Sequence, residues 1–305
     1  MDFAYYVIAG FAVGLLVGLT GVGGGSLMTP ILMLFFNVKA AVAVGTDLLY
    51  ASITKTAGIF AHGKLGNIDW KMVSLLAYGS IPAAIFTLLY LKDMDIASDH
   101  AVASIKFWLG IALLLTSVSV IFRNQLAKLS KTGHWINPTY VPALTVILGF
   151  ILGFLVTLTS VGAGALGVTA LLILYPKVNI TKIVGTDVAH AVPLTLVAGL
   201  GHASLGTVDY SLLGTLLIGS IPGIWIGSHL SSKVAEHWVR VLLALILVYV
   251  GQKLAFPQFN QLIGMVVLLF IIGFKQLGFK KPKAATQPKQ SPNQSPNQSP
   301  TETPR

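Results

Sequence analysis

The sequence predicts an all-α polytopic membrane protein made of two internal repeats of about five segments each, inverted relative to each other, plus one C-terminal helix. Three observations predict this. Hydrophobic residues make up 54% of the chain and charged residues 10%, against roughly 25% charged residues in soluble domains, and the mean hydropathy is +0.80. Apolar runs of membrane-spanning length recur along the chain, and motifs of the first half return in the second.

The first predicted repeat occupies residues 1–125. Four of its apolar runs are long enough to cross about 30 Å of hydrocarbon, namely 4–20, 40–61, 72–91 and 103–122. A shorter run, 24–36, follows the glycine-rich sequence TGVGGG at 20–25. Because a helix rises about 1.5 Å per residue, this run can span only as a short or broken helix.

The second predicted repeat occupies 140–257, after a cytoplasmic linker at 126–139. Its long runs are 140–158, 182–201, 211–230 and 238–255, and its short run, 165–176, follows the sequence TSVGAG at 159–164. A further apolar run at 260–278 predicts an additional helix within 258–279. The tail 280–305 repeats Ser-Pro-Asn-Gln units and is predicted to be disordered, because it cannot bury enough apolar surface to offset the entropy of ordering.

Repeated motifs define which residues of the two halves correspond. Those of the first half are Gly45-Thr46-Asp47, His62, Leu65-Gly66, Asp69 and Gly79-Ser80-Ile81-Pro82. They return 140 residues later as Gly185-Thr186-Asp187, His202, Leu205-Gly206, Asp209 and Gly219-Ser220-Ile221-Pro222. A duplicated hydrophobic unit with interrupted segments in corresponding positions is typical of secondary transporters, whose solute site lies where the repeats meet.

The distribution of lysine and arginine predicts the topology. Arg123, Lys128 and Lys131 favour a cytoplasmic linker, and five crossings before it place the N-terminus outside and the C-terminus in the cytoplasm. Since five is odd, the second repeat then enters the membrane inverted. If the two short runs are re-entrant, the count becomes four plus four and the repeats run parallel. The charge pattern favours the inverted arrangement.

Asp47 and Asp187 occupy matching places inside apolar segments. An ionisable group at membrane depth costs about 2.5 to 3.5 kcal/mol and usually faces a cavity or a partner. One interpretation is that each aspartate lies near the interface or caps a helix. The other is that at least one carboxylate titrates during transport or orders a ligand site. His190, one turn from Asp187, is then either a proton relay or a structural histidine.

Lys55 has no charged counterpart, because Thr195 occupies the matching position. The first half alone therefore contributes a cation, which favours selection of an anion. The alternatives are a lysine that snorkels to the membrane surface or one that neutralises Asp47.

The two glycine-rich breaks are the predicted substrate-binding segments. An unwound segment before a half-helix presents free amides and a positive dipole end, which suits an oxyanion. The alternative is close packing of helices through small residues. With Lys55, the predicted substrate-binding residues are Gly21, Gly23, Gly24, Gly25, Thr46, Ser160, Gly162, Gly164 and Thr186.

The remaining repeated residues receive structural interpretations. Pro82 and Pro222 are predicted to shape their helices. His62 and His202, with an aspartate later in each loop, are too few for a metal site, and loop capping is favoured. We expect no metal and no cofactor, and with no cysteine the chain has no thiolate chemistry.

The formal net charge of +10 does not predict nucleic-acid binding. Half of it comes from the end of the chain, where Lys275, Lys280, Lys281, Lys283, Lys289 and Arg305 stand against Glu302. A basic cluster at a helix end is typical of a topology and lipid-headgroup signal. The expected partners are therefore the lipid bilayer and a small anionic solute, and the sequence indicates no particular oligomeric state.

These motifs together resemble the TauE/SafE (sulfite exporter) family of membrane transporters. The residues that carry the resemblance are the GLTGVGGG segment, the Gly-Thr-Asp triplets, the loops from His62 to Asp69 and from His202 to Asp209, and the Gly-Ser-Ile-Pro helices, over about 4–255. The resemblance implies export of a small sulfur-containing anion, such as sulfite or an organosulfonate, across a bacterial plasma membrane. It implies no enzymatic activity.

We therefore expect a secondary transporter that works by alternating access, coupled to protons or to the membrane potential. A passive anion channel is one alternative. An intramembrane aspartyl protease is another, since two buried carboxylates can share a proton and activate water. A catalytic pair of aspartates, however, needs only the two acids, and it does not explain why the glycine break and the Gly-Ser-Ile-Pro helix are duplicated as well.

Overall fold

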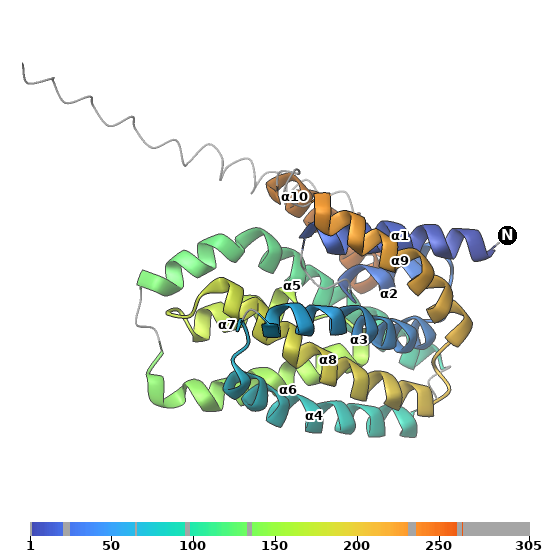
Figure 1. Cartoon of the computed structure of the whole chain (residues 1–305). Coiled ribbons are helices and arrows are strands. Elements are labelled where there is room, and N and C mark those ends of the chain that lie inside the picture. The colour runs from blue at the N-terminus through green and yellow to red at the C-terminus, as the bar shows by residue number, and fades with distance from the viewer. Residues whose placement is uncertain are drawn as a thin grey trace, which may run out of the picture. The chain divides into compact units, whose positions relative to one another are not determined.

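The computed structural model describes residues 2–20, 25–64, 66–94, 98–132, 136–230, 236–260 and 264. Contacts divide the chain into two units, Met1–Leu268 and Leu269–Arg305, and every described residue belongs to the first. All the regular elements described are helices (Figure 1), which confirms the all-α prediction. The predicted helix at 260–278, except residues 260 and 264, and the tail 280–305 lie outside the described residues.

The helices of the first half follow the predicted apolar runs closely. They are α1 Asp2–Thr20, α2 Gly25–Phe35, α3 Ala40–Lys64, α4 Trp70–Asp93 and α5 Asp99–Thr132. The main difference is the end of α5, which continues past the apolar run into the first part of the predicted linker 126–139. Polar residues there do not stop the helix, because long charged and amide side chains have high helix propensity.

The second half repeats this order of long and short helices. A short 3₁₀ turn, Pro138–Tyr140, leads into α6 Val141–Thr159, followed by α7 Ala165–Leu174, α8 Ile180–Ser204, α9 Tyr210–Leu230 and α10 Glu236–Ala255. Five helices in the described ranges are long and apolar enough to cross a membrane, over Trp70–Asp93, Asp99–Arg123, Pro138–Thr159, Ile180–Ser204 and Tyr210–Leu230. Large apolar side chains such as Phe86 and Trp225 are exposed on them, as expected of lipid-facing surfaces.

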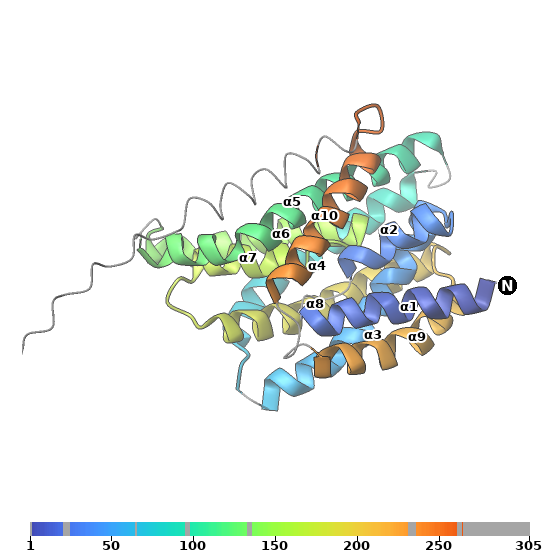
Figure 2. The same ribbon diagram turned by 90° about the horizontal axis from the view of Figure 1, so that it is seen from above.

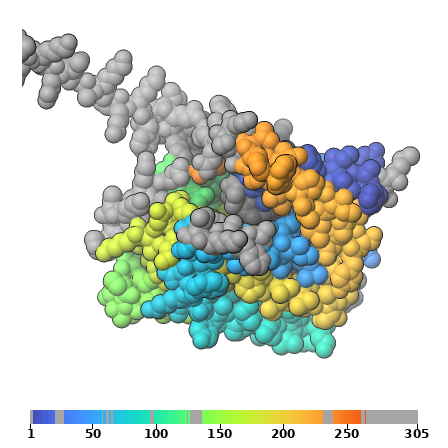
Figure 3. Space-filling model, in the orientation of Figure 1, coloured from blue at the N-terminus to red at the C-terminus, as the bar shows by residue number. Residues whose placement is uncertain are grey.

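Helices of the first half pack mainly against helices of the second. The most extensive contacts join α1 to α9, α4 to α6, α5 to α10 and α3 to α8 (Figures 1 and 2). Further contacts join α4 to α8 and α3 to α9, and the space-filling view shows side chains of these helices meeting on one face (Figure 3). The two halves therefore interlock, with α3 and α8, the helices of the two buried aspartates, in contact with each other.

Small residues allow the α1–α9 and α4–α6 pairs to approach closely. A Cβ atom at Gly10 or Gly14 would collide with a backbone carbonyl of α9, and one at Gly149 or Gly153 with a carbonyl of α4. Without a hydrophobic driving force between helices in lipid, such close backbone packing supplies much of the attraction. Small-residue packing therefore occurs between the long helices, and for the glycine-rich breaks it stays the alternative to solute binding.

We expect Gly219→Ala to destabilise the protein and Gly214→Ala to leave it unharmed. A Cβ at Gly219 of α9 would collide with the carbonyl oxygen of Val7, whereas one at Gly214, on the same helix, meets nothing within 4 Å. Overpacking typically costs about 1 to 3 kcal/mol, and alanine at an open helical site is favourable by up to ~1 kcal/mol. Thermal unfolding of both variants in detergent measures the difference. Equal unfolding temperatures would contradict the α1–α9 packing.

Candidate functional site

The second half contains the broken helix that the sequence predicts. α6 ends at Ser160, whose left-handed backbone (φ 60°) terminates the helix while its N–H bonds to the carbonyl of Val156. Gly162 and Gly164, with φ of 131° and 121°, then turn the chain into α7. In the first half, α1 ends at Thr20 and α2 begins at Gly25, and the predicted residues Gly21, Gly23 and Gly24 lie outside the described residues.

Asp47 is fully buried in the interior of α3, against the short helix α2. Its Oδ2 accepts hydrogen bonds from the N–H (3.2 Å) and the hydroxyl (2.6 Å) of Thr29. Ser160 of the second half lies beside the same carboxylate, outside hydrogen-bonding geometry, and Asp47 Oδ1 has no hydrogen-bond partner in the described part of the chain. Since α3 begins seven residues earlier, at Ala40, Asp47 does not cap it, and the capping interpretation is wrong.

Asp187 has the corresponding place in α8, against the short helix α7. The backbone N–H of Gly164, at the end of the break, lies near its carboxylate. Its Oδ1 lies so close to Gly167 that a Cβ there would collide with it. Asn179 caps α8 instead. The positive charges that act on the Asp187 carboxylate are those of Lys55 and Arg123.

Lys55 reaches from α3 into the break of the second half. Only 8% of it is exposed, and its Nζ donates to the carbonyl oxygen of Ala163 at 3.4 Å. Both buried aspartates act electrostatically on the ammonium, Asp187 more strongly than Asp47, although neither of these two carboxylates approaches it within 4 Å. The ammonium therefore points into the protein, and the snorkelling interpretation is wrong.

Two more polar pairs join the halves, and their positions correspond. His190 of α8 is buried, and its Nε2 bonds to the hydroxyl of Ser80 on α4 at 2.8 Å. Tyr50 of α3, which matches His190 in the repeat, lies beside Ser220 of α9, which matches Ser80. His190 Nδ1 and the Tyr50 hydroxyl have no hydrogen-bond partner among the described residues. The imidazole of His190 thus bonds only to Ser80 in that set, and the relay to Asp187 stays a prediction.

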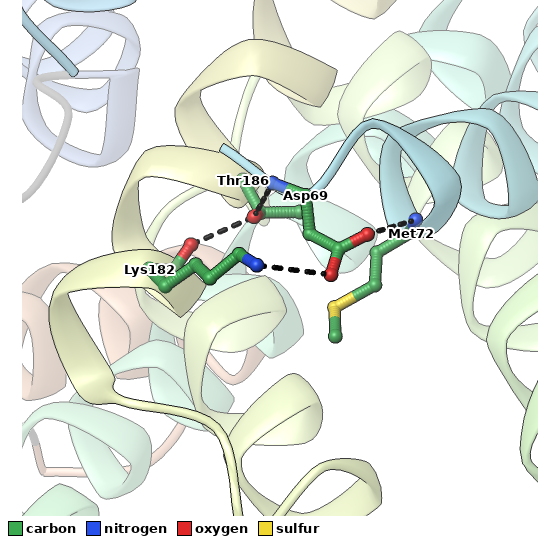
Figure 4. A network of polar contacts seen from close by, with 4 residues as sticks. All are labelled: Asp69, Met72, Lys182 and Thr186. Carbon is green, nitrogen blue, oxygen red and sulfur yellow. Dashed lines mark hydrogen bonds and ion pairs between the residues drawn. The ribbon is translucent and has the colours of Figure 1, made fainter. Parts of the chain in front are cut away.

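Thr46 and Thr186 lie at a different place from the one the sequence suggested. The Thr186 hydroxyl donates to the carbonyl of Lys182 and accepts a hydrogen bond from the N–H of Asp69, at the start of α4. Figure 4 shows that Lys182 also pairs with the Asp69 carboxylate, at 3.5 Å, and that this carboxylate caps α4 through the N–H of Met72. In the other half, the Thr46 hydroxyl accepts from the N–H of Asp209 at 3.0 Å. Both threonines therefore hold loops of the opposite half.

The loop from His202 to Asp209 has the structural role that the sequence favours. His202 bonds through Nδ1 to the hydroxyl of Thr207 and through Nε2 to the carbonyl of Thr157, and Asp209 caps α9 through the N–H of Leu212. The side chain of His62 lies outside the described residues. In the described ranges, no three histidine, cysteine or acidic residues are grouped so as to hold a metal ion.

Sequence reasoning missed four contributors to this centre. Thr29 gave no signal, and Arg123 was interpreted only as a topology marker. Ser80 and Ser220 belong to the repeated Gly-Ser-Ile-Pro motif, whose proline alone was interpreted. Recurrence of the serine was the available signal, because a hydroxyl repeated inside two apolar helices needs a partner.

Buried charges enclosed by helices long enough to cross a bilayer define the class: an integral membrane protein with a polar centre inside its helix bundle. Within that class, the chain belongs to the sulfite exporter TauE/SafE family, which matches residues 6–254. The chain is therefore a membrane transporter and not an enzyme.

Curated relatives agree with the family match. The chain is 42% identical over 250 residues to the probable membrane transporter protein YjnA of Bacillus subtilis, covering 81% of this chain and 98% of the relative. It is 29% identical over 262 residues to a probable membrane transporter protein of Methanocaldococcus jannaschii, covering 80% and 92%. No solved structure matches the chain.

Proposed function

We propose that the chain is a secondary transporter that exports a small sulfur-containing anion, such as sulfite or an organosulfonate. The observation that carries the proposal is Lys55, a buried cation whose ammonium lies at the glycine-rich break of the opposite half. A desolvated cation beside an unwound segment suits an oxyanion, because charge-assisted hydrogen bonds are strongest where water is excluded. The family description, sulfite exporter, supports the choice of a sulfur oxyanion.

The proposed mechanism is alternating access by two inverted repeats. Several contacts between the halves support it, because they correspond in pairs when the halves are exchanged. The α1–α9 pair corresponds to α6–α4, and the bond from Thr46 to Asp209 corresponds to that from Thr186 to Asp69. Such exchange suits rocking of one repeat against the other around a fixed central site.

Within this proposal the solute binds near Lys55, Ser160, Gly162 and Gly164, with Gly21, Gly23, Gly24 and Gly25 as the counterpart of that break. Asp47, Asp187 and His190 couple transport to protons or to the membrane potential, or order the site. The domains are those expected from the sequence, 1–125 and 140–257 with the linker 126–139, the helix 258–279 and the tail 280–305. We place the protein in a bacterial plasma membrane with a cytoplasmic C-terminus.

A counterflow screen on purified protein in liposomes tests the function. Sulfite, thiosulfate, sulfoacetate and taurine are compared with carboxylates of similar size, each with and without a pH gradient and a membrane potential. We expect saturable exchange of at least one sulfur oxyanion and a response to one of the two gradients. Flux that does not saturate would indicate a channel, and failure of every sulfur oxyanion would overturn the proposal.

A further inference from the structure

We propose that the central site selects a sulfur oxyanion that carries its own hydrogen-bond donor, and that Tyr50 contacts this solute. The inference rests on the proposed anion transport and adds the chemical class of the solute. It derives from a set of buried polar atoms that have no hydrogen-bond partner among the residues that the structure describes.

Three of these atoms belong to Asp47 and to two residues near it. Asp47 Oδ1, the Tyr50 hydroxyl and the Ser160 hydroxyl are buried, and none has a hydrogen-bond partner in the described part of the chain. Asp47 and Tyr50 are three positions apart on α3 and so share a face, and Ser160 reaches the same carboxylate from the other half. Leaving a buried polar group without a hydrogen bond is unfavourable, so three such groups together indicate a place that something polar occupies.

A buried tyrosine hydroxyl without a hydrogen-bond partner, as Tyr50 has among the described residues, is unusual. Tyr50 is 1% exposed and is the largest of the fully buried side chains described. Its neighbour Ser220 bonds instead to the carbonyl of Leu217 on its own helix, at 3.5 Å. A tyrosine needed only for packing would be replaced by phenylalanine without loss, whereas a buried phenol usually finds a partner.

The donor and acceptor properties of these three atoms determine which solute can bind between them. The hydroxyls of Tyr50 and Ser160 are able to donate to an oxyanion, and Lys55 supplies the charge. The free oxygen of an ionised Asp47 is an acceptor only, and it repels an anion unless that anion donates a hydrogen bond to it. A sulfonate with an O–H or N–H group satisfies both kinds of atom, and one with an alkyl group satisfies only the donors.

Two sulfonates of nearly equal size separate these cases. 2-Hydroxyethanesulfonate and propane-1-sulfonate differ by a hydroxyl in place of a methyl group, and their binding to purified protein is measured by calorimetry beside sulfite. Since a hydrogen bond to a charged group contributes about 1.5 to 3 kcal/mol, we expect the hydroxylated compound to bind at least about tenfold more tightly.

Variants separate the two parts of the inference. Tyr50→Phe is expected to weaken both sulfonates by a similar factor, because both lose the phenolic donor, and so to keep the preference. Asp47→Asn is expected to reduce the preference to less than about threefold, since the charged acceptor is lost. Tyr78→Phe, an exposed tyrosine on α4, is the matched control and should change neither value.

Equal or tighter binding of propane-1-sulfonate by the wild-type protein overturns the inference, as does sulfite binding without any binding of the hydroxylated sulfonate. Unchanged affinities in Tyr50→Phe remove Tyr50 from the site. Absence of binding by all three compounds counts instead against the proposed function.

Discussion

Lys55→Met is expected to weaken anion transport by about 30-fold or more while the protein still folds. Methionine retains most of the length and apolar contact of the lysine stem but removes the ammonium. In the wild type that ammonium lies at the Ala163 carbonyl, within electrostatic reach of both buried aspartates. Removing one member of a buried, hydrogen-bonded charge group typically costs about 2 to 5 kcal/mol of binding, which is where the 30-fold figure comes from.

The measurement is uptake of labelled sulfite into liposomes, with size-exclusion profile and unfolding temperature as tests of folding. Lys71→Met is the matched control, because Lys71 is an exposed lysine at the start of α4. We expect it to transport at the wild-type rate. If Lys55→Met transports as well as Lys71→Met does, Lys55 has no part in solute binding and the central argument for an anion is lost.

Most of the helices could be predicted from the sequence because the membrane imposes a simple rule. Every backbone group in hydrocarbon must be satisfied within its own segment, so apolar runs of sufficient length become helices. The runs 40–61 and 182–201 form α3 and α8 for this reason, and the helices extend beyond the runs by only two or three residues at an end. The apolar runs do not show which helices pack against each other. The packing of α1 against α9, for example, depends on where the glycines of the two helices meet.

The centre could be predicted only in part. Lys55, Ser160 and Gly164 lie near the two aspartates, as predicted. These residues could be predicted because the charge asymmetry and the repeated glycine breaks are visible in the sequence. The threonines beside the aspartates do not join them. Successive residues of a helix point about 100° apart, so the residue next to Asp47 or Asp187 faces a different part of the protein. For Thr46 and Thr186 that part is a loop of the opposite half.

Gly167→Ala is expected to slow transport strongly through a single collision. Asp187 Oδ1 occupies the space that a Cβ at Gly167 would fill, so even the smallest side chain must displace the carboxylate or α7. Displacement of α7 also moves Gly164, whose N–H lies near the same carboxylate, and therefore disturbs the break that Lys55 reaches. We expect transport to fall at least tenfold and stability by about 1 to 3 kcal/mol, the range typical of overpacking.

A double-mutant cycle shows whether that collision is the cause. Asp187→Ala removes the carboxylate and leaves space, so in this background Gly167→Ala should cost little or no stability, giving a coupling energy of about 1 kcal/mol or more. Gly214→Ala, at an open position on α9, should show no coupling to Asp187→Ala. If Gly167→Ala destabilises both backgrounds equally, the glycine is needed for the helix itself. The contact between α7 and the Asp187 carboxylate would then not be what holds the charged centre in place.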